Sequence, residues 1–267
     1  MSAEIIGLRQ WFETPPGQYL LEWEREHFNS AVTDIFGYHA LQLGLPDLDT
    51  LHDNRMPHKW MATPRVPMAM RDGVLQPALV TDFSALPFPE ASLDLVVLPH
   101  TLELSHDPHA TLREVERVLV PEGRVVISCL NPASLWGLRQ RRAHLYQYLG
   151  FGQLYLPPGG DFLGYWRMRD WLRLLSFEVE SAHFGCYRPA LRSAKWLNRY
   201  AWMDQVGARW WPIFGAVYFL VAVKRVRGMR LMGPAWKSKA AIATAPISVA
   251  NQTRSHRTPK EPELESH

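Results

Sequence analysis

The sequence contains only two cysteines, Cys129 and Cys186, in 267 residues. They stand far apart and form no Cys-x-x-Cys spacing, which argues against a disulfide framework and against a cysteine zinc site. The first residues also lack a basic start followed by an apolar run, so we expect no signal peptide. A reducing, cytoplasmic environment is therefore the expectation.

The sequence lacks a hydrophobic run long enough to cross a membrane. The longest run extends from Trp210 to Val223, contains a proline and a glycine, and falls short of the roughly 18–20 residues that a spanning helix needs. We interpret it as a buried strand, with a membrane segment as the weaker alternative. The net charge is only +3, too small a bias to indicate nucleic-acid binding by the whole protein. We thus expect neither a membrane span nor a nucleic-acid partner.

Several short catalytic patterns are missing as well. No expected strand is followed by G-x-G-x-x-G, which disfavours a dinucleotide-dependent dehydrogenase, and there is no G-x-S-x-G or G-x-x-x-x-G-K-[ST], which disfavours a hydrolase or a P-loop ATPase. His100, His106 and His109 lie close together in the sequence. We expect no metal site there, because His106 and His109 fall at the beginning of an expected helix.

Apolar patterning indicates strands that alternate with helices over most of the chain, which predicts a parallel sheet with helices on both faces. We expect one folded domain over residues 1–228, with a helical N-terminal segment of about residues 1–37, and a disordered polar tail over 229–267. The expected strands are "HALQLG", "HKWMAT", "QPALVTDF", "LDLVVL", "RVVISCL", "FEVESAHF" and "AVYFLVAVKRV".

Two helices are clearly patterned. "GQYLLEWEREHFNSAVTDIFG" is amphipathic, and Gly37 can end it. "HDPHATLREVERVL" has Asp107 as a capping residue and Pro108 in its first turn. "VPEG" is then expected to form a turn before the next strand.

A set of residues in the middle of the chain agrees with one family in kind, order and spacing. They are Asp82, "LPF" at 86–88, Ser92, Asp94, Leu112, Glu114, Arg117, Val118, Leu119, Pro121 and Gly123. This segment resembles the class I S-adenosylmethionine-dependent methyltransferases, in particular the type 11 methyltransferase domain. The resemblance implies a Rossmann-like, seven-stranded, mostly parallel sheet with a final antiparallel strand. It also implies S-adenosylmethionine as cofactor and methyl transfer to an unidentified small-molecule acceptor.

The resemblance also implies a cofactor site. Asp82 would accept a hydrogen bond from the adenine amino group, and Phe83 would meet the adenine ring; alternatively, Asp82 only caps its own loop. Ligands of open parallel sheets bind beyond the carboxyl ends of the strands, so Gly44 and the segment Pro99, His100 and Thr101 are further candidates for cofactor contact. His100 is also a candidate catalytic residue, as a substrate contact or proton acceptor, or else a histidine that bonds local backbone.

The family's glycine-rich loop is largely replaced in this chain. Aligned by the first strand, Gln42 takes the place of an acid, Gly44 that of the first glycine, Pro46 that of the second and Leu48 that of the third. No acid in register follows the next strand to bind the ribose, although the acids among residues 47–53 are possible substitutes. The alternative function is therefore a catalytically silent methyltransferase-like binding or scaffold module. The oligomeric state is not predicted.

Aromatic residues gather between the fifth strand and the helix that follows. Tyr155, Phe162, Tyr165 and Trp166 lie in "GFGQLYLPPGGDFLGYW". They are candidates to enclose an apolar or aromatic substrate, or to pack against the surface of their own domain.

Overall fold

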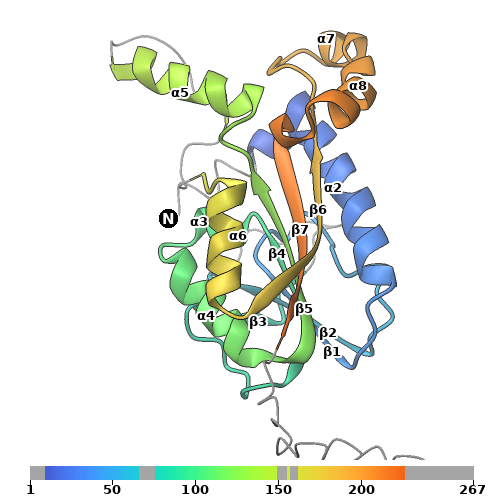
Figure 1. The fold of residues 1–267 in the computed structure, drawn as a ribbon, viewed down its shortest axis with the longest axis vertical. Helices are drawn as coiled ribbons and strands as arrows, with labels where there is room; N and C mark the ends of the chain where they lie inside the picture. Colours follow the sequence, from blue (N-terminus) through green and yellow to red (C-terminus); the bar gives the residue numbers. More distant parts are fainter. Residues whose placement is uncertain (1–9, 66–75, 149–154, 157–161, 226–267) are drawn as a thin grey trace, which may run out of the picture. The chain divides into compact units, whose positions relative to one another are not determined.

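The computed structural model describes residues 10–65, 76–148, 155–156 and 162–225 (Figure 1). The chain separates into two units, Met1–Arg227 and Gly228–His267, and all described residues belong to the first. The expected tail over 229–267 lies outside the described residues. Among the helices that the structure describes, none is both long and apolar enough to span a membrane.

Seven strands form one sheet in the order β3-β2-β1-β4-β5-β7-β6. Strand β7 is antiparallel to both of its neighbours, and the other pairings are parallel. This confirms the predicted fold class. The strands are β1 His39–Leu43, β2 His58–Thr63, β3 Leu79–Val80, β4 Leu93–Pro99, β5 Leu119–Leu130, β6 Phe177–Gly185 and β7 Val217–Lys224.

The sheet has a topological switch point between β1 and β4. From β1 the chain builds outward to β2 and β3, then returns to place β4 on the other side of β1. The loop after β1 enters one core through Leu48, whereas α4, which follows β4, enters the other through Leu112. The connections therefore go to opposite faces, which leaves a crevice at the carboxyl ends of β1 and β4. The fold itself thus marks one place where a ligand is expected.

Helices cover both faces of the sheet (Figure 1). Leu20, Phe28 and Val32 of α2 enter one apolar core, whereas α4 and α6 contribute to the other through residues such as Leu112 and Met168. Helix α2 begins at Pro15, before the expected start at Gly17, because the Thr14 side chain accepts Gly17 N–H and prolines occupy the first turn. The helices are α2 Pro15–Thr33, α3 Thr101–Leu104, α4 Pro108–Val118, α5 Leu135–Tyr148, α6 Tyr165–Leu174, α7 Ala194–Arg199 and α8 Trp202–Trp210, and a 3₁₀ turn, η1, spans Pro212–Phe214.

Two other boundaries also differ from those expected. Helix α2 ends at Thr33 rather than near Gly37, and a Cβ on Gly37 would lie 2.4 Å from the side chain of Asp94. Gly37 therefore permits close approach, and Asp94 accepts the backbone N–H groups of Tyr38 and His39 at the start of β1. The run from Trp210 to Val223 is a strand only from Val217 onward.

The "VPEG" segment belongs to β5 in the structure rather than to a separate turn. It lies within Leu119–Leu130, where the register against β4 shifts between Leu93 and Leu95, and Glu122 has φ of 65°. The bend expected from Pro121 and Gly123 is thus accommodated as an irregularity of one strand.

Candidate cofactor and substrate site

Gly44, Phe83 and Thr101 meet at the carboxyl ends of β1 and β4. Gly44 has φ of +75°, a conformation that glycine adopts without strain. A Cβ built on Gly44 would lie 3.4 Å from Thr101 Oγ1 and 3.8 Å from the ring of Phe83. The Thr101 hydroxyl donates to the carbonyl of Leu43. Three of the residues predicted for cofactor contact are thus brought together at the switch point.

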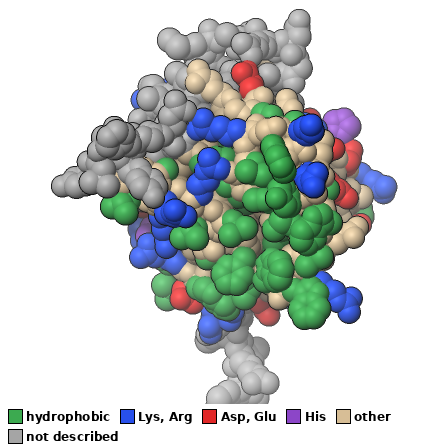
Figure 2. All heavy atoms as spheres, turned by 90° about the horizontal axis from the view of Figure 1, so that it is seen from above, with side chains coloured by type: hydrophobic (Ala, Val, Ile, Leu, Met, Phe, Trp, Pro, Cys, Tyr) green, Lys and Arg blue, Asp and Glu red, His purple; other side chains and the backbone are tan. Residues whose placement is uncertain are grey.

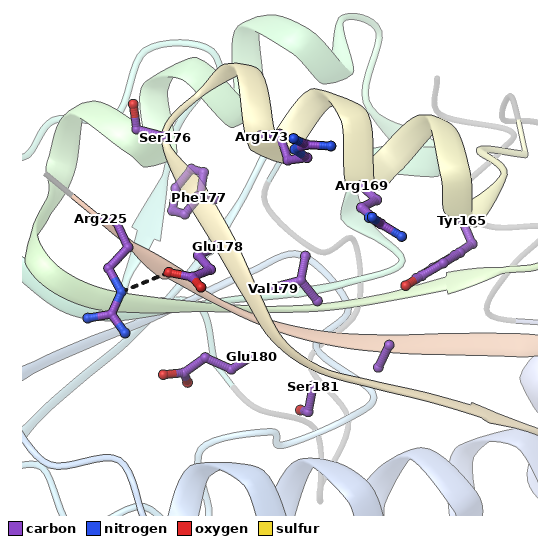
Figure 3. A pocket seen from close by; sticks show the side chains of 11 residues that line it. Tyr165, Arg169, Arg173, Ser176, Phe177, Glu178, Val179, Glu180, Ser181 and Arg225 are labelled. Atoms are coloured by element: carbon purple, nitrogen blue, oxygen red, sulfur yellow. Dashed lines mark hydrogen bonds and ion pairs between the residues drawn. The ribbon is translucent and has the colours of Figure 1, made fainter. Parts of the chain in front are cut away.

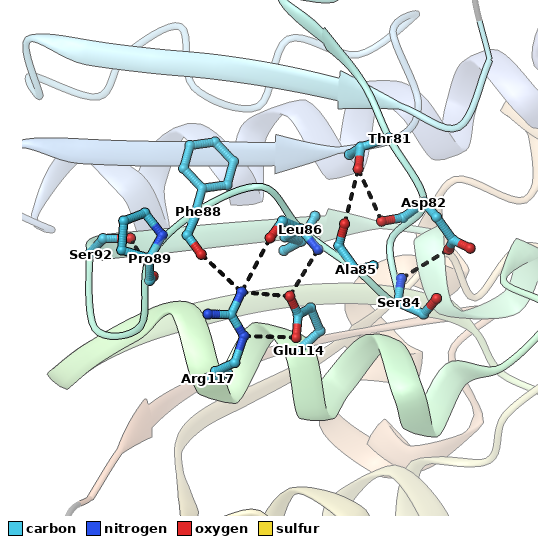
Figure 4. A network of polar contacts seen from close by, with 10 residues as sticks. All are labelled: Thr81, Asp82, Ser84, Ala85, Leu86, Phe88, Pro89, Ser92, Glu114 and Arg117. Atoms are coloured by element: carbon cyan, nitrogen blue, oxygen red, sulfur yellow. Dashed lines mark hydrogen bonds and ion pairs between the residues drawn. The ribbon is translucent and has the colours of Figure 1, made fainter.

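Asp82 lies on the exposed loop after β3 (Figure 4). Its Oδ1 accepts the backbone N–H of Ser84 at 3.0 Å, and this bond lowers the pKa of the carboxyl group. The expected capping of its own loop is therefore present. Because the carboxylate is exposed, capping does not prevent a second hydrogen bond to a ligand.

Glu114 and Arg117 of α4 hold the loop that follows Asp82. Glu114 Oε1 accepts the backbone N–H of Leu86 at 2.8 Å, while Arg117 donates to the carbonyls of Leu86 and Phe88 (Figure 4). The two side chains also pair with each other, so the pKa of Glu114 is lowered and that of Arg117 is raised. These residues of the recognisable pattern therefore shape the loop instead of carrying chemistry.

Gln42 organises the loop that replaces the glycine-rich one. Its side-chain amide donates toward the carbonyls of Gly44, Leu45 and Leu48, at 2.7–3.2 Å. Its side-chain oxygen accepts both the backbone N–H and the hydroxyl of Thr50, at 3.1 and 2.7 Å. The three carbonyls on one side and two donors on the other fix the orientation of the amide.

Leu48 does not occupy the place of a flexible loop residue. Its side chain is fully buried in the core beside α2. Leu45 has φ of 44°, so the left-handed turn that glycines usually provide occurs at Gly44 and Leu45. Of the acids between 47 and 53, Asp49 accepts Leu51 N–H and Asp53 pairs with His52; their structural role is local.

His100 lies between two carboxylates in the interior. Its Nδ1 is 3.0 Å from Glu103 Oε2, and its Nε2 is 3.0 Å from Glu24 Oε1, which comes from α2. The first contact is a hydrogen bond, whereas the second has the geometry of an ion pair, since neither Nε2 nor Oε1 has an aligned hydrogen-bond partner. The three side chains are 0–4% exposed.

Both ring nitrogens of His100 thus face carboxylates in the interior, which favours a structural role over that of a proton acceptor. Burial by itself lowers the pKa of His100, but the charges of Glu24 and Glu103 outweigh it and raise the pKa to about 10. The direction of this shift favours the protonated imidazole between the two carboxyl groups. The backbone N–H of His100 donates to Ser128, and its φ of 50° is left-handed.

Glu24, Glu103 and Gln42 were not predicted from the sequence. The sequence could have indicated that Glu24 is buried, because it stands four residues from Leu20 and four from Phe28 on the buried side of α2. An acid at that position needs a partner in the core. Glu103 accepts the backbone N–H of Leu130, which links α3 to the end of β5, and burial raises its pKa despite His100.

The aromatic residues expected to enclose a substrate mainly pack against their own domain. Tyr155 is 3% exposed and Tyr165 packs against Phe184 and Tyr218. Trp166 is exposed.

A hollow lies along the edge strand β6, between α6 and Arg225 (Figure 3). Tyr165, Arg169 and Arg173 line it from α6, and Arg225 pairs there with Glu178. It lies at the opposite edge of the sheet from β1 and β2, so it is separate from the switch point. Within the described residues, no group of three or more His, Cys, Asp or Glu is placed to hold a metal ion.

Comparison with known proteins agrees with this geometry. Residues 63–127 match the family described as "Methyltransferase domain". The match runs from the end of β2 through β3 and β4 into β5, and it includes the loop held by Glu114 and Arg117. Over these residues the chain is similar to that family, and its fold is the one found in S-adenosylmethionine-dependent methyltransferases. Its strand order, with β7 antiparallel, is the order that the predicted family implies.

Individual relatives extend the likeness. The chain is 29% identical over 222 residues to the uncharacterized protein YafS of Escherichia coli strain K12, covering 83% of this chain and 82% of that protein. It is 40% identical over 58 residues to a malonyl-[acyl-carrier protein] O-methyltransferase of Halorhodospira halophila, covering 22% and 20%. A solved structure of an S-adenosylmethionine-dependent methyltransferase from Thermotoga maritima, described as a possible histamine N-methyltransferase, aligns with a TM-score of 0.54, at 15% identity over 81% of this chain and 94% of that one. The last likeness concerns the fold.

Proposed function

We propose that this methyltransferase moves a methyl group from S-adenosylmethionine to a small-molecule acceptor in the cytoplasm, and that the cofactor binds where Gly44, Phe83 and Thr101 meet. The observation that carries the proposal is this meeting at the switch point, since open parallel sheets bind ligands there. Asp82 stands on the neighbouring loop, with an exposed carboxylate.

The residues at this edge fit a nucleoside cofactor in two respects. Gly44 leaves an open position facing Phe83 and Thr101, because a side chain there would point toward both. Phe83 supplies an aromatic ring 9% exposed, against which an adenine can lie. The exposed Asp82 supplies an acceptor for the exocyclic amino group, and a charged acceptor strengthens such a bond.

Two features depart from the pattern that the family resemblance implies. Gln42 stands in place of the acid, and its side chain forms hydrogen bonds with residues of its own loop. No carboxylate follows β2, where the chain continues with Pro64 and Arg65. We therefore infer that adenine contacts contribute more to affinity here than ribose contacts.

When bound, the cofactor supplies a methyl group already activated by its sulfonium. The remaining task of the protein is to align the acceptor and exclude water. The buried Glu24–His100–Glu103 cluster serves this task indirectly, because it fixes α2, the end of β4 and the end of β5 relative to one another. We assign His100 as a positioning residue.

A second candidate function is a catalytically silent binding or scaffold module. The replaced glycine loop favours it, since Pro46 restricts the backbone where the family has glycine. Calorimetric titration of the wild-type protein with S-adenosylmethionine and with its demethylated product separates the two. Binding of both ligands at one site supports the enzyme; absence of binding for both supports the silent module.

A further inference from the structure

Tryptophans gather on the surface at one end of the domain. Trp196, Trp202, Trp210 and Trp211 are 41–73% exposed, and Ile213 and Phe214 are also exposed. They belong to α7, α8 and η1, except Trp211, which lies between α8 and η1. Monomeric proteins seldom expose a contiguous apolar patch of this kind unless it contacts a partner or a membrane.

Helix α5 extends the same surface. Leu135, Leu138 and Leu145 are exposed, and their spacing of three and seven residues places them on one side of the helix. Trp136 Nε1 donates to the carbonyl of Arg188 at 2.8 Å, so α5 begins beside the segment that leads into α7. We call the exposed apolar residues of α5, α7, α8 and η1 the tryptophan face.

The tryptophan face lies at the carboxyl end of the parallel strands. Helix α5 follows the end of β5, and α7 and α8 follow the end of β6, which runs in the same direction because both strands are antiparallel to β7. In Figure 1 these helices lie beyond the strand ends, and Figure 2, seen from above, shows gathered hydrophobic side chains with several Lys and Arg and a few Asp and Glu around them.

The charge around the tryptophan face is almost entirely positive. Segments 132–148 and 188–216 contain eight basic residues and one acid, Asp204. That acid is engaged by Arg188 at 2.9 Å and by the hydroxyl of Tyr19. The basic residues are Arg139, Arg141, Arg142, Arg188, Arg192, Lys195, Arg199 and Arg209.

We propose that the tryptophan face docks the protein onto an anionic phospholipid surface, without crossing it. Tryptophan has an apolar ring system with one polar N–H and suits the interface between headgroups and acyl chains, while Arg and Lys attract anionic headgroups. A second copy of the chain is a poor occupant, because two such basic faces repel each other. An acidic protein would need cavities that fit projecting side chains on three separate helical segments, whereas a fluid bilayer adapts to them.

Docking in this orientation turns the carboxyl end of the sheet toward the lipid. The proposed cofactor site is at the same end, because β1 and β4 are parallel to β5. The docking itself does not depend on the proposed function, since vesicle binding requires neither cofactor nor methyl acceptor.

Cosedimentation of the full chain with lipid vesicles tests the proposal. The probes are vesicles of phosphatidylcholine alone and of phosphatidylcholine mixed with phosphatidylglycerol. We expect binding to the mixed vesicles, weakened by salt. The double variant Arg141→Gln/Arg142→Gln should lose about 25-fold in partitioning, at roughly fivefold per cation. Trp210→Ala/Trp211→Ala should lose about tenfold or more on the same vesicles.

A matched control uses aromatic residues at the other end of the domain. Phe36 and Tyr38 are 70% and 71% exposed and precede β1, so Phe36→Ala/Tyr38→Ala should bind vesicles as the wild type does. If the wild type does not bind anionic vesicles at low salt, the proposal is overturned. Equal binding by the wild type and by both variants of the tryptophan face also overturns it. The tryptophan face would then be assigned to a protein partner instead.

Discussion

Glu24 Oε1 lies 3.0 Å from Nε2 of His100, deep in the interior and with no exposed surface on either side chain. The contact joins a helix that precedes the first strand to the residue that ends the fourth. Glu103 approaches the other ring nitrogen at 3.0 Å, so the imidazole lies between two buried carboxyl groups. A buried charge is tolerated only when it is paired in this way.

Replacing His100 should therefore destabilise the fold strongly. In His100→Gln, Glu24 and Glu103 lose the positive charge between them, and we expect a loss of about 3–5 kcal/mol in the free energy of unfolding. Urea denaturation measures it. The triple variant Glu24→Gln/His100→Gln/Glu103→Gln should recover part of this loss, because it removes the carboxylates as well. A single variant as stable as the wild type would show that the ion pairs do not matter.

The same cluster predicts a stability loss at alkaline pH. The pKa of His100 is raised from its usual value of 6.5 to about 10, so the protonated imidazole stabilises the folded state. This contribution is fully present below about pH 6.5 and is lost as the pH rises through 10. Melting temperatures of the wild type and His100→Gln should converge over this range. Parallel pH profiles of the two proteins would contradict the assignment.

The hydrogen bonds of Gln42 predict that an acid at this position destabilises the protein. Gln42→Glu would introduce the acid that the family resemblance places there. However, a carboxylate cannot donate to the carbonyls of Gly44, Leu45 and Leu48, and would face them in the interior. We expect a loss of about 2–4 kcal/mol in unfolding free energy, since buried polar atoms lose their partners. Chemical denaturation checks this; a stabilised variant would mean that the loop has a different arrangement.

The loop variants Pro46→Gly and Leu48→Gly should behave differently. Pro46 is partly exposed on the turn, so its replacement should tighten S-adenosylmethionine binding by relieving the restricted φ angle, with a stability loss of about 1 kcal/mol or less. Leu48→Gly empties a fully buried position and should lose about 3–5 kcal/mol of stability. Calorimetry together with thermal melting separates the effects. Unchanged affinity in Pro46→Gly would exclude the turn as a determinant of binding.

Much of the fold could be predicted from the sequence, because its signals are local. Asp107 caps α4 as expected, and the apolar runs of β4 and β5 indicate strands covered on both faces. The recognisable residues Asp94, Glu114 and Arg117 proved to be structural, since they fix backbone groups of β1 and of the loop after Asp82.

The interior of the site could not be predicted in the same way. The pairing of Glu24 with His100 depends on how α2 packs against the sheet, a contact between distant parts of the chain. Gln42 was aligned with an acid by position, but its hydrogen bonds depend on the course of the next eight residues. Local sequence patterns reveal neither the pairing of Glu24 with His100 nor the hydrogen bonds of Gln42. An acid on the apolar side of α2 was the feature of the sequence that pointed to the cluster.

The most direct test of the central claim compares S-adenosylmethionine binding by the wild type, Asp82→Asn and Asp82→Ala in calorimetric titrations. If Asp82 accepts the adenine amino group, Ala should remove about 1.5–3 kcal/mol of binding free energy, a roughly 10- to 150-fold rise in Kd. Asn retains an acceptor and should lose less, and the demethylated cofactor should show the same order. Unchanged affinity in Asp82→Ala, with a lower melting temperature from the lost cap on Ser84, would contradict the proposed cofactor site.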